Sequence, residues 1–227
     1  MDKTKKGDFI ELEFTGSVKG GDIFDTNIKE DAKKINLNLE GDKPLIICIG
    51  QGMVLPGFDK ALENKDTSKK YSIELQPKEA FGQRDRKIIR LIPIKIFQEK
   101  KINPYPGLTL NIDNMLVKVV SVSGGRVLVD FNHPLAGKEL VYEFVIKRKI
   151  ESLEEKVKSI IDFFVGKEFK FSIKDNHVVF EIEEYFSPII KSLNDRFKDI
   201  LGCEMTVEAK KLAKEETKNN DKETTPQ

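Results

Sequence analysis

The chain has 227 residues, of which 39 are Lys or Arg and 38 are Asp or Glu, so its formal net charge is +1. This balance argues against a general binder of nucleic acids or other polyanions. With two cysteines far apart, two histidines and no Cys/His cluster, the sequence does not predict a structural zinc site.

The N-terminal segment predicts no membrane or secretory role. MDKTKKGDF has no apolar signal core, and no run in the chain approaches the roughly 18 apolar residues of a membrane span. We therefore expect a cytoplasmic protein in a reducing compartment, with both cysteines as free thiols and no membrane partner.

The first third of the chain is rich in strand patterns. In residues 9–18, apolar Ile10, Leu12 and Phe14 alternate with polar residues, which predicts a strand with one buried face. The further elements expected here are a turn at Gly20-Gly21, a loop or bulge (29–43), a buried strand (44–52), a short helix from Pro56 and an alternating strand (69–77).

The pattern changes at about residue 86. Residues 86–100 read as an extended segment followed by a short helix from Pro93, and three strands follow at 108–114, 115–123 and 126–132. Residues 140–150 look like the closing strand of the first sheet. The sequence therefore predicts an insertion over 86–129 in a discontinuous domain made of 1–85 and 130–151.

The last third predicts a small α+β domain over 152–213. A capped helix (152–166) precedes a hairpin turning at Asp175-Asn176 and a helix (187–202). Some sixty residues bury little surface alone, so we expect this unit to dock on the rest of the chain or on a second copy. The tail 214–227 is expected to be disordered.

Conventional catalytic groups are scarce. His177 follows a turn and reads as a surface residue, and no serine or cysteine sits in a nucleophile motif. What remains is a set of aromatic and aliphatic residues with one acid, Asp25. From residue types alone, this set is either an ordinary core or an apolar pocket.

Five segments in order carry a resemblance: FTG (14–16), IFDTN (23–27), IGQGMVLPGFDKAL (49–62), PKEAFGQRD (77–85) and NHPLAGKEL (132–140). Together they resemble the FKBP-type peptidyl-prolyl isomerases, and more narrowly the SlyD-like and long-chain archaeal members. The resemblance covers about residues 5–150. It implies an α+β fold, in which a half-wrapped antiparallel sheet surrounds a short helix and an insert-in-flap chaperone domain interrupts the chain.

The resemblance also implies a pocket for a proline ring. The residues carried over as catalytic are Phe14, Phe24, Asp25, Ile47, Val54, Leu55, Phe58, Phe81 and Tyr142. The residues expected to bind substrate are His133 and Leu135 at the pocket rim, and Ile92, Ile94 and Phe97 in the insertion. The apolar face of residues 88–97 either packs into a small core of the insertion or forms an exposed patch that holds unfolded chains, and the resemblance favours the patch. The family usually has Trp where this chain has Phe58, and often Tyr where it has Phe14 and Phe81.

The function implied is isomerisation of X-Pro bonds in folding proteins, coupled to a chaperone domain that binds unfolded polypeptide. The alternative is a holdase or scaffold whose isomerase pocket is vestigial. No cofactor or nucleic acid is expected. No metal is expected either, because the tail lacks the His- and Cys-rich metal segment frequent in SlyD-type proteins. A homodimer through the C-terminal domain is one arrangement open to the chain.

Overall fold

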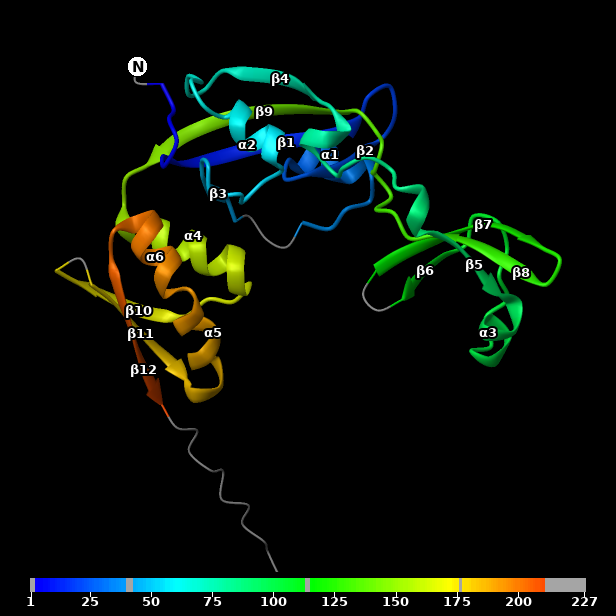
Figure 1. The fold of residues 1–227 in the computed structure, drawn as a ribbon. Coiled ribbons are helices and arrows are strands. Elements are labelled where there is room, and N and C mark those ends of the chain that lie inside the picture. Colours follow the sequence, from blue (N-terminus) through cyan, green and yellow to red (C-terminus); the bar gives the residue numbers. More distant parts are fainter. Residues whose placement is uncertain (1–2, 40–42, 113–114, 176, 211–227) are drawn as a thin grey trace, which may run out of the picture. The chain divides into compact units, whose positions relative to one another are not determined.

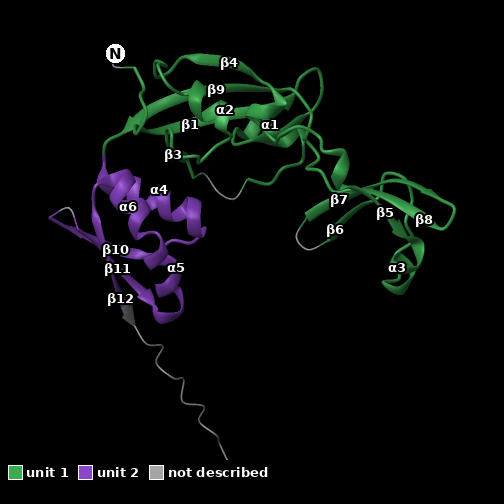
Figure 2. Cartoon of the chain, in the orientation of Figure 1, with its two compact units in different colours: residues 1–151 green, residues 152–227 purple. Residues whose placement is uncertain are grey.

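The computed structural model describes residues 3–39, 43–112, 115–175 and 177–210. The chain divides into two compact units, residues 1–151 and 152–227 (Figure 2). Within the described ranges, no helix combines the length and the apolar character that a membrane crossing requires. Both units mix helices with sheets, and most strand pairs among the described residues are antiparallel, which confirms the predicted α+β class.

The first sheet of unit 1 is built from strands distant in sequence (Figure 1). Its strands are β1 (Phe9–Val18), β2 (Ile23–Thr26), β3 (Leu45–Cys48), β4 (Lys70–Leu75) and β9 (Leu140–Ile150). Their order is β2-β1-β9-β4, with β3 also paired to β1, and all pairs are antiparallel. Because β9 lies between β1 and β4, the sheet is complete only after the chain returns from the insertion.

A short helix packs against this sheet. In α2 (Pro56–Ala61), Pro56 starts the helix where no backbone N–H is needed, and Phe58 is 1% exposed. A Cβ on Gly57 would lie 2.7 Å from the Cβ of Glu79 in the 3-10 turn η1 (Pro77–Glu79). The glycine therefore allows the helix to approach this turn closely.

One predicted loop is partly a helix. Residues 29–34 form α1 (Lys29–Lys34), with Asp31 in its first turn and Lys34 in its last, as the helix dipole favours. Only Ala32 of this helix is buried, and six residues are too few to show a helical apolar period. The sequence pattern therefore did not indicate a helix here. Residues 40–42, at the end of the predicted loop, lie outside the described ranges.

The inserted segment forms a second sheet. Its elements are η2 (Arg86–Ile88), β5 (Ile89–Pro93), α3 (Ile94–Glu99), β6 (Thr109–Ile112), β7 (Met115–Ser123) and β8 (Arg126–Asp130). The strand order is β5-β8-β7-β6, and every pair is antiparallel. Its buried core consists of Phe97, Val117, Val119, Val127 and Val129. Residues 113–114 of the predicted first strand lie outside the described ranges.

Side chains join the two passages of the chain into and out of the insertion. The Asn132 side chain accepts a hydrogen bond from the Asp85 backbone N–H at 2.7 Å and donates one to the Asp85 carbonyl at 2.9 Å. Asp130 accepts from Asn132 and from Arg84, and these bonds outweigh its desolvation and hold its pKa below the ordinary value. Asn132 thus pairs with the opposite segment as a strand residue would.

Unit 2 has a three-stranded sheet with helices. Its elements are α4 (Leu153–Val165), β10 (Lys170–Lys174), β11 (His177–Glu183), η3 (Glu184–Phe186), α5 (Ser187–Ser192), α6 (Asn194–Leu201) and β12 (Glu204–Lys210). Ser152 caps α4 by accepting from the Glu155 N–H, and Gly166 ends it in a left-handed conformation. The predicted turn residue Asn176 lies outside the described ranges.

Two expectations for unit 2 were wrong. The single helix expected over 187–202 is two helices that meet at Leu193. Strand β12 was not expected, and it pairs in parallel with β11 from Glu204 to Lys210. A parallel partner requires a crossover, here η3, α5 and α6, so no local turn signals it.

Candidate active site

Three buried rings from three elements form the base of the site. Phe58 of α2 and Tyr142 of β9 stack with their ring centres 4.5 Å apart. Phe14 of β1 lies 5.9 Å from each of them. All three side chains are buried, and the strand alternation of β1 and β9 directs Phe14 and Tyr142 to the side of the sheet that α2 covers.

Two half-buried rings extend this base toward solvent. Phe24 of β2 lies 5.9 Å from Tyr142 and 6.1 Å from Phe81, which follows η1. Phe81 in turn stacks on His133, with centroids 4.2 Å apart and planes 4° from parallel. Six rings from distant segments are therefore contiguous, from the buried Phe14 to the exposed His133.

His133 belongs to the aromatic wall rather than to an acid–base pair. Its Nδ1 accepts a hydrogen bond from the Leu135 backbone N–H at 3.2 Å, which requires that nitrogen to be unprotonated. Partial burial against Phe81 lowers the pKa of His133, in the direction that this geometry favours. Leu135 is half-buried beside it.

Gly16 makes the ring contacts sterically possible. A Cβ at this position would lie 2.9 Å from Cζ of Phe24 and 3.0 Å from Cε1 of Tyr142. The register of β1 against β2 also shifts between Gly16 and Ser17. The sequence pattern did not single out Gly16, although a glycine inside a strand often marks such a close approach.

Asp25 and the Tyr142 hydroxyl are two polar groups at the ring cluster. Asp25 is an exposed residue, yet desolvation of its carboxylate raises its pKa against the opposing hydrogen bond from the Thr26 backbone. Burial, and secondly the charge of Asp25, raises the pKa of Tyr142 well above its usual value. The phenol is therefore a neutral hydrogen-bond donor at physiological pH.

The loop before α2 carries Val54 and Leu55, both half-buried. Buried Asp59 of α2 accepts hydrogen bonds from the backbone N–H groups of Gly50 at 2.7 Å and Gly52 at 3.0 Å, and so holds the loop to the helix. The Leu55 carbonyl accepts from Asp59, while its N–H donates to no described residue. Sequence reasoning missed Asp59, whose partners are backbone groups.

Polar side chains form a brace along the part of β1 that carries Phe14. On this edge of β1, β3 pairs only up to Leu12 and β2 only from Thr15. Asn27 accepts from the Phe14 N–H at 2.8 Å, and Thr26 donates to the Phe14 carbonyl at 2.9 Å. These two side chains take the place of a strand partner, and sequence reasoning missed both.

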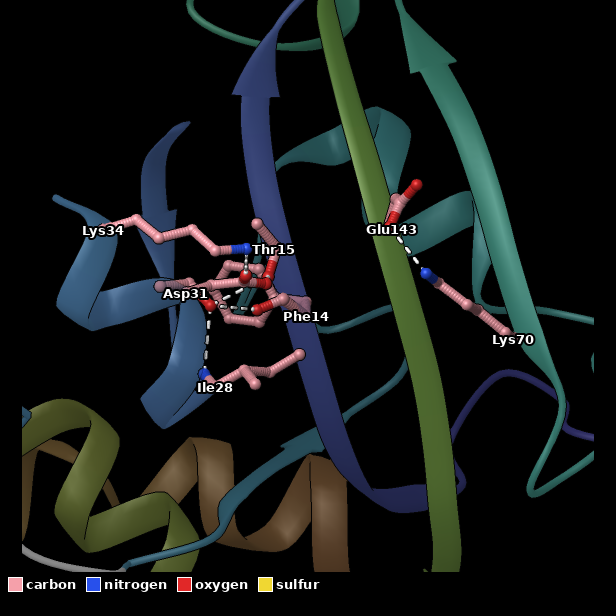
Figure 3. Close-up of polar contacts among 8 residues, drawn as sticks. Phe14, Thr15, Ile28, Asp31, Lys34, Lys70 and Glu143 are labelled. Atoms are coloured by element: carbon pink, nitrogen blue, oxygen red, sulfur yellow. Dashed lines mark hydrogen bonds and ion pairs between the residues drawn. The ribbon is translucent and has the colours of Figure 1, made fainter. Parts of the chain in front are cut away.

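Helix α1 completes the brace. Asp31 accepts a hydrogen bond from the Thr15 hydroxyl at 2.6 Å and forms an ion pair with Lys34 at 2.6 Å, as Figure 3 shows. The bonds from Lys34 and then from Thr15 lower the pKa of Asp31. The carboxylate therefore stays ionised and keeps α1 attached to β1.

Four further predicted residues lie in β3 and in the inserted segment. Ile47 of β3 is fully buried opposite Ile10, so it supports the sheet and offers no surface to a ligand. Phe97 is 4% exposed in the core of the inserted sheet, and Ile92 and Ile94 pack against that core. Phe97 is therefore core, whereas Ile92 and Ile94 are half-buried, and a substrate-binding role for these residues stays a prediction.

Known protein families and relatives match both the first sheet and the inserted segment. Residues 1–95 match the family model of FKBP-type peptidyl-prolyl cis-trans isomerases, and residues 90–135 match a model described as FKBP26, IF domain. The chain is 32% identical over 145 residues to a short-type peptidyl-prolyl cis-trans isomerase of Methanocaldococcus jannaschii, which is 63% of this chain and 90% of that protein. The chain belongs to the FKBP-type peptidyl-prolyl cis-trans isomerases.

SlyD proteins are also among the similar FKBP-type isomerases. SlyD of Aeromonas hydrophila is 27% identical over 140 residues, which cover 61% of this chain and 60% of that protein. SlyD of Haemophilus influenzae is 30% identical over 118 residues, covering 50% and 62%. The chain thus matches somewhat less than two thirds of either SlyD. The predicted resemblance to a SlyD-like FKBP with an inserted domain is confirmed, and the chain is a peptidyl-prolyl cis-trans isomerase.

Proposed function

We propose that the ring cluster from Phe14 to Phe81 is the pocket in which this FKBP-type isomerase binds the proline of an X-Pro bond. The observation that carries the proposal is the contiguous aromatic set around Tyr142, edged by one carboxylate, Asp25. No nucleophile–base pair is needed, because the reaction breaks no covalent bond.

The chemistry suits an apolar site. Rotation about an X-Pro bond has a barrier of about 20 kcal/mol, and its two end states differ by about 1 kcal/mol. A planar amide is more polar than a twisted one, so transfer from water to the rings destabilises the planar state more. Each tenfold gain in rate requires only about 1.4 kcal/mol of such preference.

Polar groups at the rim orient the substrate in this proposal. The N–H of Leu55 has no acceptor among the described residues and is offered to a substrate carbonyl. The neutral Tyr142 hydroxyl is a second donor. His133 and Leu135 form the outer wall, where His133 keeps Phe81 in place by stacking.

The inserted sheet acts as the chaperone arm. Its core is closed, but large apolar side chains remain on its surface: Leu91, Ile96, Tyr105, Met115, Leu116 and Val120. We assign the capture of unfolded polypeptide to these exposed residues. Loose capture raises the concentration of X-Pro segments near the pocket. We further propose a cytoplasmic location and a homodimer through unit 2.

The alternative function is a holdase whose pocket is vestigial, and Phe at positions 14 and 81, where the family often has Tyr, is the feature that favours it. Phe58→Ala separates the two. Loss of this stacked ring should lower kcat/KM for a short X-Pro peptide about 10- to 100-fold, and leave suppression of aggregation intact. Unchanged peptide turnover in a folded variant would favour the holdase. Circular dichroism provides the check on folding.

A further inference from the structure

The inserted sheet has one face that its core leaves uncovered. In β8, Val127 and Val129 are fully buried, so Leu128 between them points to the opposite side. Leu91 of β5 pairs directly with Leu128 and is 59% exposed. Leu116 precedes buried Val117 in β7 and is 51% exposed.

Val120 belongs to the same surface. It lies where the register of β7 against β8 shifts, between Val119 and Ser121, and is 40% exposed. We call this surface the outer face, formed by Leu91, Leu116, Val120 and Leu128. It crosses three neighbouring strands of one sheet, β5, β8 and β7.

The insertion is also the basic part of a nearly neutral chain. Over 86–129 its basic residues are Arg86, Lys87, Arg90, Lys95, Lys100, Lys101, Lys118 and Arg126, and its acidic residues are Glu99 and Asp113. The insertion thus has a charge of +6, whereas the remaining 31 basic and 36 acidic residues give −5.

These basic side chains are available to a partner. All eight are exposed, and none forms an ion pair with a described residue. In the first sheet, by contrast, Lys19 bonds both Glu74 at 2.6 Å and Glu139 at 3.0 Å. Lys118 and Arg126 alternate with buried valines, so they lie on the outer face itself.

We propose that the outer face selects unfolded segments in which apolar residues are flanked by Asp or Glu. This inference rests on the proposed chaperone function and specifies its client class. The apolar strip binds client side chains, and Lys118 and Arg126 pair with the acidic flanks. Aliphatic side chains offer no stacking platform for bases, which disfavours single-stranded nucleic acid as the occupant.

The test uses the full chain and three fluorescein-labelled unstructured peptides. They share one apolar centre and differ in their flanks, which are Asp, Ser or Lys. Fluorescence anisotropy at low salt should give the tightest binding for the Asp-flanked peptide, about fivefold tighter than the Ser-flanked one. The difference should shrink at about 0.3 M salt, because these charges are exposed.

Paired variants assign the effect to the outer face. The double variant Lys118→Glu and Arg126→Glu should reverse the order, so that the Lys-flanked peptide binds best. Lys174→Glu with Lys191→Glu, an equal charge change on exposed lysines of unit 2, should keep the original order. Circular dichroism and thermal unfolding show that each variant is folded, and turnover of a short X-Pro peptide shows that its pocket is intact.

The outcomes separate the two proposals. Equal binding of the three peptides, or an unchanged order in the Lys118/Arg126 variant, overturns the charge selection and leaves the chaperone arm standing. If no peptide binds, the proposed chaperone function fails as well. A competition with an RNA oligonucleotide is the last check. If RNA displaces the Asp-flanked peptide from the full chain but not from the Lys174/Lys191 variant, the acidic ligands bind at these lysines of unit 2 and not at the outer face. That result would overturn the inference.

Discussion

Desolvation of the Asp25 carboxylate lowers the stability of the folded protein at neutral pH, and this effect can be measured. Its folded pKa is raised, so the folded state binds the proton more tightly than the unfolded chain does, and stability falls as pH rises through this window. Asp25→Asn should therefore raise the free energy of unfolding at neutral pH, by less than about 1 kcal/mol because the residue is partly exposed.

Urea unfolding at about pH 7 and pH 3 measures this difference. The gain should disappear in acid, where Asp25 is already protonated. A variant less stable than the parent at neutral pH would show that the carboxylate makes a stabilising contact that outweighs its desolvation.

Gly16 sets the spacing of two pocket rings. Gly16→Ala places a methyl group against Phe24 and Tyr142, so we expect the free energy of unfolding to fall by about 1–3 kcal/mol. Peptide kcat/KM should fall about tenfold. The matched control is Gly21→Ala, where the nearest atom to a Cβ is 3.4 Å away. Equal activity of both variants would mean that the ring spacing does not limit catalysis.

Aromatic positions could be predicted from sequence because each lies in a short recognisable segment. The structure brings Phe14, Phe24, Phe58, Phe81 and Tyr142 together, while their catalytic roles stay predictions. The supporting polar side chains could not be found this way. An Asn that replaces a strand partner, or an Asp that binds two backbone N–H groups, is defined only by its folded neighbours.

The loop of residues 50–55 and helix α2 act as one element through Asp59. Asp59→Asn replaces one acceptor oxygen by a donor facing a backbone N–H, so the unfolding free energy should fall by about 1–3 kcal/mol. The loop carrying Leu55 loosens, and KM for a short peptide should rise. Asp66→Asn, which removes a surface pair with Lys69, is the control. Equal KM values in the two variants would separate the loop from substrate binding.

Elements with strong local patterns were predictable, and those fixed by distant partners were not. The alternation in β1 and β9 and the glycine stop of α4 can be read directly. Strand β12 owes its existence to parallel pairing with β11. The apolar run in 88–97 could form either a core of the insertion or a surface patch. In the structure its residue Phe97 belongs to the buried core of the inserted sheet.

At the scale of the whole molecule, unit 1 carries both the proposed isomerase pocket and the basic inserted sheet. The passages between them are fixed by Asn132 and its bonds to Asp85. We propose that the pocket is catalytic by itself and that the insertion supplies client binding.

The most direct measurement compares the full chain with a version in which a short loop replaces residues 86–129. Two rates are recorded for each: isomerisation of a short X-Pro peptide and refolding of a protein limited by proline isomerisation. We expect similar peptide rates for the two versions and much faster protein refolding with the full chain. If neither version accelerates the peptide, the pocket is not catalytic and the proposed division of roles is wrong.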